Sequence, residues 1–325
     1  MVALWILLAV AVVIAGLYFL EKHRLKRDAE KFPCPGQRVD VNGRRMHVCA
    51  SGEGERTLVL LPGLGTYADW IDFLPLTRRL PDFRCVVLEP FGYGWSDDTP
   101  EPRTVKNIVD EVRAGLRVAG FEPPCVLLGH SIAGLYVRWW ACEYPDEVAG
   151  IIGDDPSLPE QANEPEAMKE LPDHGAALAL LKLACALRPL GLGRLCTRLS
   201  SAYTVYMTGG DLAQLPAAQA LAAAKWLNRD VLGEYVHFRE NAAAADEWFP
   251  TCPMLMFVAN GPASCESLEF KSGFSWVKAH QQTAERAGGK CYVLPGGHYL
   301  HWMFPDEMAR RIREEYLPVQ EIGKP

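Results

Sequence analysis

Short apolar runs alternate with stretches of helical periodicity along most of the chain. The apolar runs predict strands over residues 37–41, 46–50, 57–61, 85–88, 125–128, 148–152, 254–258 and 290–294. The intervening periodicity predicts helices over residues 70–80, 105–119, 132–144, 275–287 and 305–316. Asn42-Gly43 predicts a hairpin between the first two strands. This alternation indicates the α/β class, with a mostly parallel sheet whose strands are buried on both faces.

The stretch from about Pro156 to Pro250 interrupts the alternation. It is rich in Ala and Leu and has a helical pattern, as in the run HGAALALLKLACALRPLGLGRL over residues 174–195. Because the stretch lies between two predicted strands, we interpret residues 156–250 as a helical cap over one edge of the sheet. A second packed helical layer is the alternative. The core then comprises residues 32–155 and 251–325.

Residues 2–20 contain no charged side chain. As a helix with a rise of 1.5 Å per residue, this run would extend about 29 Å, close to the thickness of a bilayer's hydrocarbon core. No Lys or Arg precedes the run, and it exceeds the usual apolar region of a signal peptide, so we expect an uncleaved membrane anchor and linker over residues 1–31. The Lys and Arg residues between positions 22 and 27 then place the rest of the chain in the cytoplasm.

The composition excludes several classes of protein. The chain has 325 residues, of which 49% are hydrophobic and 22% are charged, and this balance excludes a disordered or fibrous protein. The net charge of −7 provides no basic excess for phosphate groups, which argues against a nucleic-acid partner. The ten cysteines contain no C-x-x-C motif, so we expect reduced thiols rather than a disulfide scaffold or a metal site.

One motif carries the chemistry. The predicted strand over residues 125–128 continues through Gly129-His130 to Ser131 and runs directly into a predicted helix. This is the layout of a nucleophile elbow, a sharp turn that lifts a serine hydroxyl clear of the sheet. A serine hydroxyl is a poor nucleophile at neutral pH and needs a base within hydrogen-bond reach.

The loops after two other strands supply the remaining groups. His298 follows the last predicted strand and is the expected base, with His301 as the second choice. Leu64 follows the strand over residues 57–61, and its N–H together with that of Ile132 could form an oxyanion hole. A metal site on the two histidines is the alternative, but no third ligand is evident, so we expect neither a metal nor an organic cofactor.

On these motifs the chain resembles the α/β-hydrolase superfamily over about residues 39–317. The motifs are LPGLG (61–65), EPFGYGWSD (89–97), GHSIAG (129–134), YPDEVAGIIGDDP (144–156) and GGHYLHW (296–302). Pro62 stands where many members have His, and Ala133 replaces the second Gly of the elbow. The resemblance implies an eight-stranded core, a helical cap between strands six and seven, and acyl-transfer roles for Ser131 and His298.

The resemblance leaves the acid of a catalytic triad open. Most relatives have an Asp after strand seven, where this chain offers Glu266, whereas some have it after strand six, where this chain has Asp154 and Asp155. Successive side chains of a strand point in opposite directions, so only one of these two aspartates can face the histidine. We favour Asp155, with Glu266 and Asp154 as alternatives. Its role would be to hold the imidazole tautomer and stabilise the imidazolium.

These inferences predict a membrane-anchored serine hydrolase of the esterase and lipase type. It would cleave a carboxylic ester or thioester of a small, lipophilic acyl substrate through an acyl-enzyme. An acyltransferase with the same triad is one alternative. A non-catalytic ligand-binding protein with the hydrolase fold is the other, and the uncertain acid favours it. Epoxide or halide chemistry on this scaffold would need a carboxylate in place of Ser131.

Overall fold

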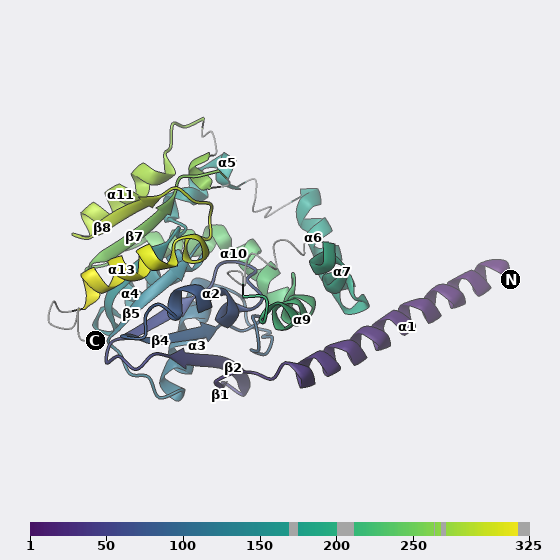
Figure 1. Ribbon diagram of the computed structural model, residues 1–325. Coiled ribbons are helices and arrows are strands. Elements are labelled where there is room, and N and C mark those ends of the chain that lie inside the picture. The colour runs from purple at the N-terminus through teal and green to yellow at the C-terminus, as the bar shows by residue number, and fades with distance from the viewer. Residues whose placement is uncertain (169–174, 200–210, 263, 268–270, 318–325) are drawn as a thin grey trace.

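The core of the protein is one sheet between two layers of helices (Figure 1). The computed structural model describes residues 1–168, 175–199, 211–262, 264–267 and 271–317. In this part of the chain the sheet has eight strands in the order β1-β2-β4-β3-β5-β6-β7-β8. Their bounds are β1 Gln37–Val41, β2 Arg44–Ser51, β3 Thr57–Leu61, β4 Arg84–Glu89, β5 Cys125–His130, β6 Val148–Asp154, β7 Met254–Ala259 and β8 Lys290–Leu294.

The strand directions confirm the mostly parallel sheet that the sequence predicts. Strand β2 pairs antiparallel with β1 and with β4, and every other neighbouring pair is parallel. Each predicted strand is present, with ends that differ from the prediction by no more than two residues. The central strands are buried along their whole length, as their continuous apolar runs require.

Helices cover both faces of the sheet. One layer contains α3 and α4 together with α11, and the other contains α2, α12 and α13. Alternate residues of β3 supply the two interfaces, because Val59 and Leu61 pack into the first layer while Leu58 and Leu60 pack into the second. The bounds are α2 Asp69–Thr77, α3 Val105–Val118, α4 Ala133–Glu143, α11 Trp276–Arg286, α12 Leu300–Met303 and α13 Pro305–Tyr316.

The described part of residues 156–250, between β6 and β7, is largely helical. Its elements are the 3-10 helices η2 Pro159–Asn163 and η3 Arg188–Leu190, and the helices α5 Pro165–Met168, α6 Gly175–Leu187, α7 Leu192–Leu199, α9 Leu215–Lys225 and α10 Arg229–Asp246. Helix α10 packs against α4 and η2, whereas α7 packs against α9. The insertion therefore packs on the core through α10, whereas α7 packs against another helix of the insertion.

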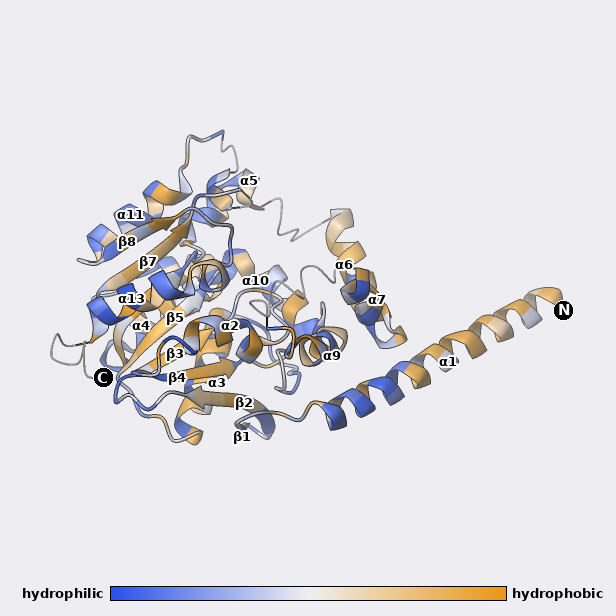
Figure 2. Cartoon of the chain, viewed as in Figure 1, coloured by the Kyte–Doolittle hydropathy of each residue, from blue (hydrophilic) through white to orange (hydrophobic). Residues whose placement is uncertain are grey.

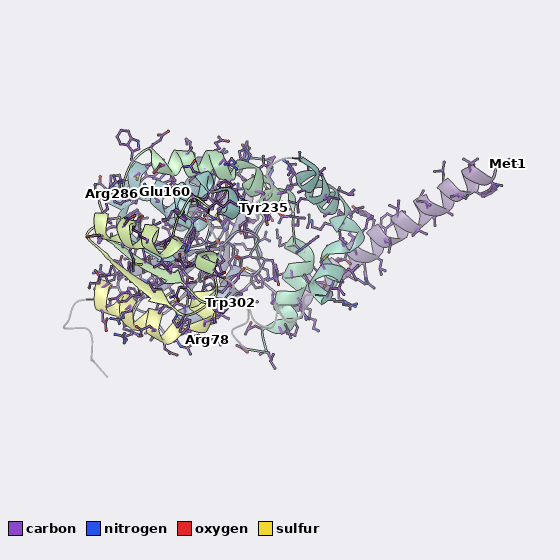
Figure 3. The ribbon with its side chains drawn as sticks, turned by 90° about the horizontal axis from the view of Figure 1, so that it is seen from above. Met1, Arg78, Glu160, Tyr235, Arg286 and Trp302 are labelled. Atoms are coloured by element: carbon purple, nitrogen blue, oxygen red, sulfur yellow. The ribbon has the colours of Figure 1, made fainter. Side chains whose placement is uncertain are left out.

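The N-terminal, apolar part of helix α1 (Val2–Lys31) projects away from the body in two perpendicular views (Figures 1 and 3), whereas its C-terminal part contacts η3 and α9. All side chains of residues 2–20 are exposed. An 18-residue window of this helix has a mean hydropathy of 2.7, whereas its end nearest the body is hydrophilic (Figure 2). The helix is long and apolar enough to cross a membrane, and a signal sequence would have the same character.

The close approach of β5 and α4 gives a test of the fold. A Cβ atom built on Gly129 would lie 2.6 Å from the carbonyl oxygen of Ala133, which is backbone and cannot move independently. We expect Gly129→Ala to lower the free energy of unfolding by about 1–3 kcal/mol, because the added methyl group forces strand and helix apart. Urea denaturation of the purified protein measures the change. Gly16→Ala, where the same methyl group meets open space, is the control, and equal stability of the two variants would contradict the prediction.

Candidate active site

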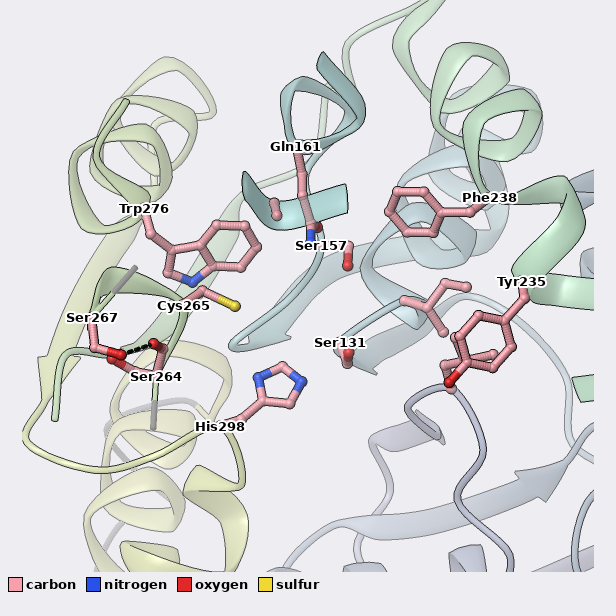
Figure 4. A pocket seen from close by; sticks show the side chains of 13 residues that line it. Ser131, Ser157, Gln161, Tyr235, Phe238, Ser264, Cys265, Ser267, Trp276 and His298 are labelled. Atoms are coloured by element: carbon pink, nitrogen blue, oxygen red, sulfur yellow. Dashed lines mark hydrogen bonds between the residues drawn. The ribbon is translucent and has the colours of Figure 1, made fainter. Parts of the chain in front are cut away.

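The loops after four strands meet at the carboxyl edge of the sheet. Leu64 follows β3, Ser131 and Ile132 follow β5, Asp155 follows β6 and His298 follows β8. Four of these residues, all but Asp155, line a pocket of about 390 Å³ (Figure 4). The carboxyl edge of an open α/β sheet is the usual position of a ligand site, because the loops there can vary without changing the sheet.

Ser131 occupies the sharp turn between β5 and α4. Its φ of +54° lies in the left-handed region, which is uncommon for a residue with a side chain and typical of strained functional turns. Backbone hydrogen bonds hold the turn: the Ser131 N–H donates to Asp154 O at 3.2 Å, and Ser131 O accepts from Gly134 N and Ser157 N. The backbone is therefore fixed, and the hydroxyl side chain borders the pocket.

His298 is held by Asp155. Its Nδ1 atom lies 2.6 Å from Oδ2 of the Asp155 carboxylate. With Nδ1–H donating to this carboxylate, Nε2 is the nitrogen left with a lone pair, and Figure 4 shows the ring directed toward Ser131. In the part of the chain that the structure describes, no hydrogen bond links the two side chains, and such bonds in free enzymes commonly tighten only when substrate binds.

Asp155 is fully buried and has two further donors. Its Oδ1 atom accepts from the indole Nε1 of Trp276 at 2.8 Å and from the N–H of Ala259 at 3.0 Å. Both carboxylate oxygens are thus satisfied, as a buried charge requires. Because Asp155 adopts a left-handed φ of +43° directly after β6, its side chain leaves the strand pattern and reaches His298.

Two opposing effects set the pKa of His298. Burial by itself lowers it, but the hydrogen bond and the negative charge of Asp155 outweigh burial, and the pKa is raised. A base of this kind accepts a proton more readily than a free imidazole. The ring is 29% exposed, so it remains accessible from the pocket.

Leu64 and Ile132 line the pocket, and in the described residues neither backbone N–H donates a hydrogen bond. Unpaired donors beside a serine hydroxyl are suited to an oxyanion. Gly63 lets the loop after β3 approach the turn at Ser131, because a Cβ atom on Gly63 would lie 2.6 Å from His130 Nδ1 and 3.2 Å from Ser131 Cβ.

The other candidate acids have different partners. Asp154 is buried and binds Nδ1 of His301, whose Nε2 lies 3.2 Å from Oδ2 of Asp72. Glu266 accepts from Val277 N at 2.8 Å and from the Ser275 hydroxyl, so it caps the start of α11. Neither carboxylate is bonded to His298.

His301, the second-choice base, is also placed elsewhere. It is fully buried between Asp154 and Asp72, away from the pocket lining. Burial lowers its pKa, but the two carboxylates raise it to about 10. At neutral pH it is therefore a buried imidazolium, which has no lone pair with which to take the proton of Ser131.

The described residues contain two groups of three possible metal ligands. Within each group, the ligand atoms all lie within 4.8 Å of one another. One contains His301 with Asp154 and His130, and the other contains His298 with Asp155 and Cys265. In the first, both ring nitrogens of His301 already bond carboxylates, those of Asp154 and Asp72. In the second, Asp155 and His298 already bond each other, so the arrangement fits a proton relay better than a metal site.

Several residues of the pocket had no sequence signal. Ser157 and Gln161 come from the start of the insertion, Tyr235 and Phe238 from α10, and Cys265 from the loop after β7. The positions of the first four depend on how the insertion folds back over the sheet, which apolar periodicity cannot show.

The comparisons with known proteins agree on the fold. A family model described as alpha/beta hydrolase fold matches residues 56–193. The Uncharacterized protein YbdG of Bacillus subtilis is 31% identical over 157 residues, which is 48% of each chain. A pimeloyl-[acyl-carrier protein] methyl ester esterase of Xanthomonas oryzae is 31% identical over 127 residues, 38% of this chain and 46% of the esterase.

Among solved structures, Epoxide Hydrolase A from Mycobacterium thermoresistibile superposes with a TM-score of 0.65. The sequence identity is 19%, and the match covers 86% of this chain and 97% of the hydrolase. The matches to the curated relatives described above span about half of their length, whereas the structural match extends over nearly the whole fold.

The buried imidazolium gives a pH-dependent prediction. An unfolded histidine has a pKa near 6.5, and the folded His301 has a pKa of about 10, so between these values the folded chain holds the extra proton. The contribution is full below pH 6.5 and is lost as the pH rises toward 10. We expect the free energy of unfolding to fall over this range, with His301 contributing up to about 1.4 kcal/mol per pH unit.

Denaturant titrations at pH 7, 8, 9 and 10 measure this slope. His301→Gln should be less stable at pH 7 and should show a shallower slope. His23→Gln, which removes an exposed histidine of α1, is the control. A slope for His301→Gln as steep as that of the wild type would show that His301 is not the group that holds the proton.

Proposed function

Because the chain belongs to the α/β-hydrolase superfamily, we propose that it is a serine hydrolase that cleaves carboxylic esters or thioesters through an acyl-enzyme. One observation carries the proposal: the His298 ring lies in the pocket beside Ser131, and its Nδ1 atom lies 2.6 Å from Oδ2 of the buried Asp155 carboxylate. A serine, a base and a group that orients the base are the parts that nucleophilic catalysis needs.

The proposed reaction has two halves. Ser131 Oγ attacks the acyl carbonyl carbon while His298 Nε2 takes the hydroxyl proton, and the N–H groups of Leu64 and Ile132 donate to the oxyanion. When this intermediate collapses, His298 protonates the leaving alcohol or thiol and an acyl-Ser131 ester remains. Water, deprotonated by His298, then attacks the ester, which releases the acid and restores the Ser131 hydroxyl.

The surroundings of the histidine support this role. Asp155 fixes the Nδ1–H tautomer, and Trp276 and the N–H of Ala259 fix Asp155 in turn. Each oxyanion donor contributes about 3–4 kcal/mol to the stability of the transition state in enzymes of this kind. Two donors and an oriented base favour a catalytic protein over one that only binds a ligand.

The nucleophile bears on the reaction type. The structural relative is named an epoxide hydrolase, and the Xanthomonas relative is named a methyl ester esterase. Epoxide opening on this scaffold would use a carboxylate nucleophile, whereas position 131 is Ser. The pocket combines aromatic residues such as Phe238 and Trp276 with polar ones such as Gln161, and its volume suits a small acyl group.

We further propose that α1 anchors the enzyme in a membrane with the body on the cytoplasmic side. The exposed apolar stretch over residues 2–20 has the length of a bilayer span, and basic residues follow it directly. An apolar helix of this length in water would be unfavourable, which supports a lipid environment.

The nucleophile is tested with a fluorophosphonate probe, which reacts with activated serines. We expect the probe to label the wild-type chain and not Ser131→Ala. Asp155→Asn should lower kcat/KM for a p-nitrophenyl ester by roughly 10³- to 10⁴-fold, because the histidine loses its orienting charge.

Glu266→Gln is the matched control, since it makes the same carboxyl-to-amide change at a residue that caps α11. Its kcat/KM should stay within a few-fold of the wild-type value. Equal labelling of Ser131→Ala and wild type, or a larger loss in Glu266→Gln than in Asp155→Asn, would refute the assignments.

The anchor is tested by extraction of membranes with alkaline carbonate. We expect the chain to stay in the membrane pellet with its N-terminal segment intact by mass spectrometry. The double variant Leu8→Arg, Val12→Arg should move to the supernatant, because each arginine at the centre of a span costs about 2.5–3.5 kcal/mol. Loss of the first residues by cleavage would instead identify a signal sequence.

A further inference from the structure

Helix α6 is apolar on nearly its whole surface and is buried nowhere. Its sequence GAALALLKLACAL contains Lys182 as the one charged residue, and none of its 13 residues is buried. The exposed fractions are 66% for Leu180 and 54% for Leu183. Figure 2 shows the apolar colouring of this helix. A surface of this kind is unfavourable in water and marks a contact with another apolar phase.

Helix α7 continues the exposed apolar surface after a sharp bend. Leu195 and Leu199 are exposed, while the opposite side of α7 is pressed against α9, where a Cβ atom on Gly193 would lie 2.9 Å from Ala223 O. The segment Gly175–Leu190 meets Leu192–Leu199 at 103°. Because α6 alone would extend only about 20 Å, neither helix can cross a bilayer.

Contacts with α1 fix the level of α7 along the anchor. Arg194 binds Glu21 at 3.0 Å and Asp28 at 2.8 Å. Glu21 is the first charged residue after the apolar stretch over residues 2–20, so it marks the point where a membrane-spanning α1 would leave the hydrocarbon. The ion pair therefore places α7 at the membrane surface.

The charges around this junction match a headgroup layer. A groove of about 340 Å³ between α1, α7 and α9 is bordered by the cations Arg27, Lys31 and Arg198. Both Figure 1 and Figure 3 show α6 and α7 on the side of the body from which α1 projects. Apolar side chains with basic residues beside them are typical of helices that lie in a bilayer interface.

We propose that α6, η3 and α7 form a second membrane contact, which lies in the interfacial layer of the bilayer that α1 enters. The inference rests on the proposed anchor function of α1. It adds that the body is held against the bilayer at two places and not tethered loosely. Helix α6 also contacts α10, which carries Tyr235 and Phe238 of the pocket, so the membrane contact adjoins the pocket wall.

The test uses the full chain in nanodiscs that contain a phosphatidylcholine with a diazirine in its acyl chain. After irradiation, mass spectrometry locates the lipid adducts. We expect adducts on α1 and on α6 or α7. Adducts on α1 alone would overturn the inference and leave the anchor standing, with a protein partner, a second copy included, as the cover of α6. Adducts on neither segment would overturn both.

A matched pair of variants excludes incidental labelling. Leu180→Ser with Leu183→Ser should lower the adduct yield on α6 by about tenfold while α1 is labelled as before. The control is Trp248→Ser, at 65% exposure. Its neighbour Phe249 stacks on Arg286, which Figure 3 shows on the side of the body away from Met1. Unchanged α6 labelling in the double variant would contradict the inference. Labelling needs no turnover, so an inactive enzyme would refute the proposed hydrolase alone.

Discussion

The register of three neighbouring parallel strands is the constraint on which the site depends. Leu61 pairs with Gly129, and His130 pairs with Asp154, so β3, β5 and β6 end at one level. The residues that follow them are therefore brought to one edge without any long connection. Asp154 is the last residue of β6, whereas Asp155 follows the strand with a left-handed φ of +43°, which directs its side chain to His298. The identity of the acid beside His298 thus depends on where β6 ends relative to β5.

Buried ion pairs reinforce this edge. His301 lies between Asp154 and Asp72, and His47 Nδ1 lies 2.8 Å from Glu89 Oε2, with both partners fully buried. Glu89 ends β4, and it also accepts from the N–H of Trp95 at 2.6 Å. Such pairs add little net stability over apolar packing, but removal of one partner costs about 3–5 kcal/mol. These pairs therefore disfavour alternative arrangements of the strand ends. Because Glu89 and Trp95 both belong to the EPFGYGWSD motif, this motif has a structural role.

The parts that the sequence predicts are those set by local pattern. The strands follow from continuous apolar runs, and the elbow follows from a strand that enters a helix through Gly129 and Ser131. The choice between Asp154 and Asp155 needed coordinates, because alternation shows only that the two diverge and not which one meets His298. Glu266 illustrates the same limit: a carboxylate in the expected loop caps α11 instead. The pocket wall from Tyr235 and Phe238 depends on long-range packing of the insertion, which has no local signature.

The insertion connects the candidate active site with the proposed membrane contact. Helix α10 presents side chains to the pocket and packs on α4, the helix that begins at the elbow. Helix α7 is tied through Arg194 to the end of the apolar part of α1. A chain of packed elements thus connects the nucleophile to the proposed bilayer surface. An acyl substrate dissolved in that bilayer would meet the enzyme at a fixed orientation, whereas a flexible tether would leave the pocket free to face bulk water. The ion pairs of Arg194 with Glu21 and Asp28 are what distinguish these two cases, because they restrict rotation of the body about its anchor.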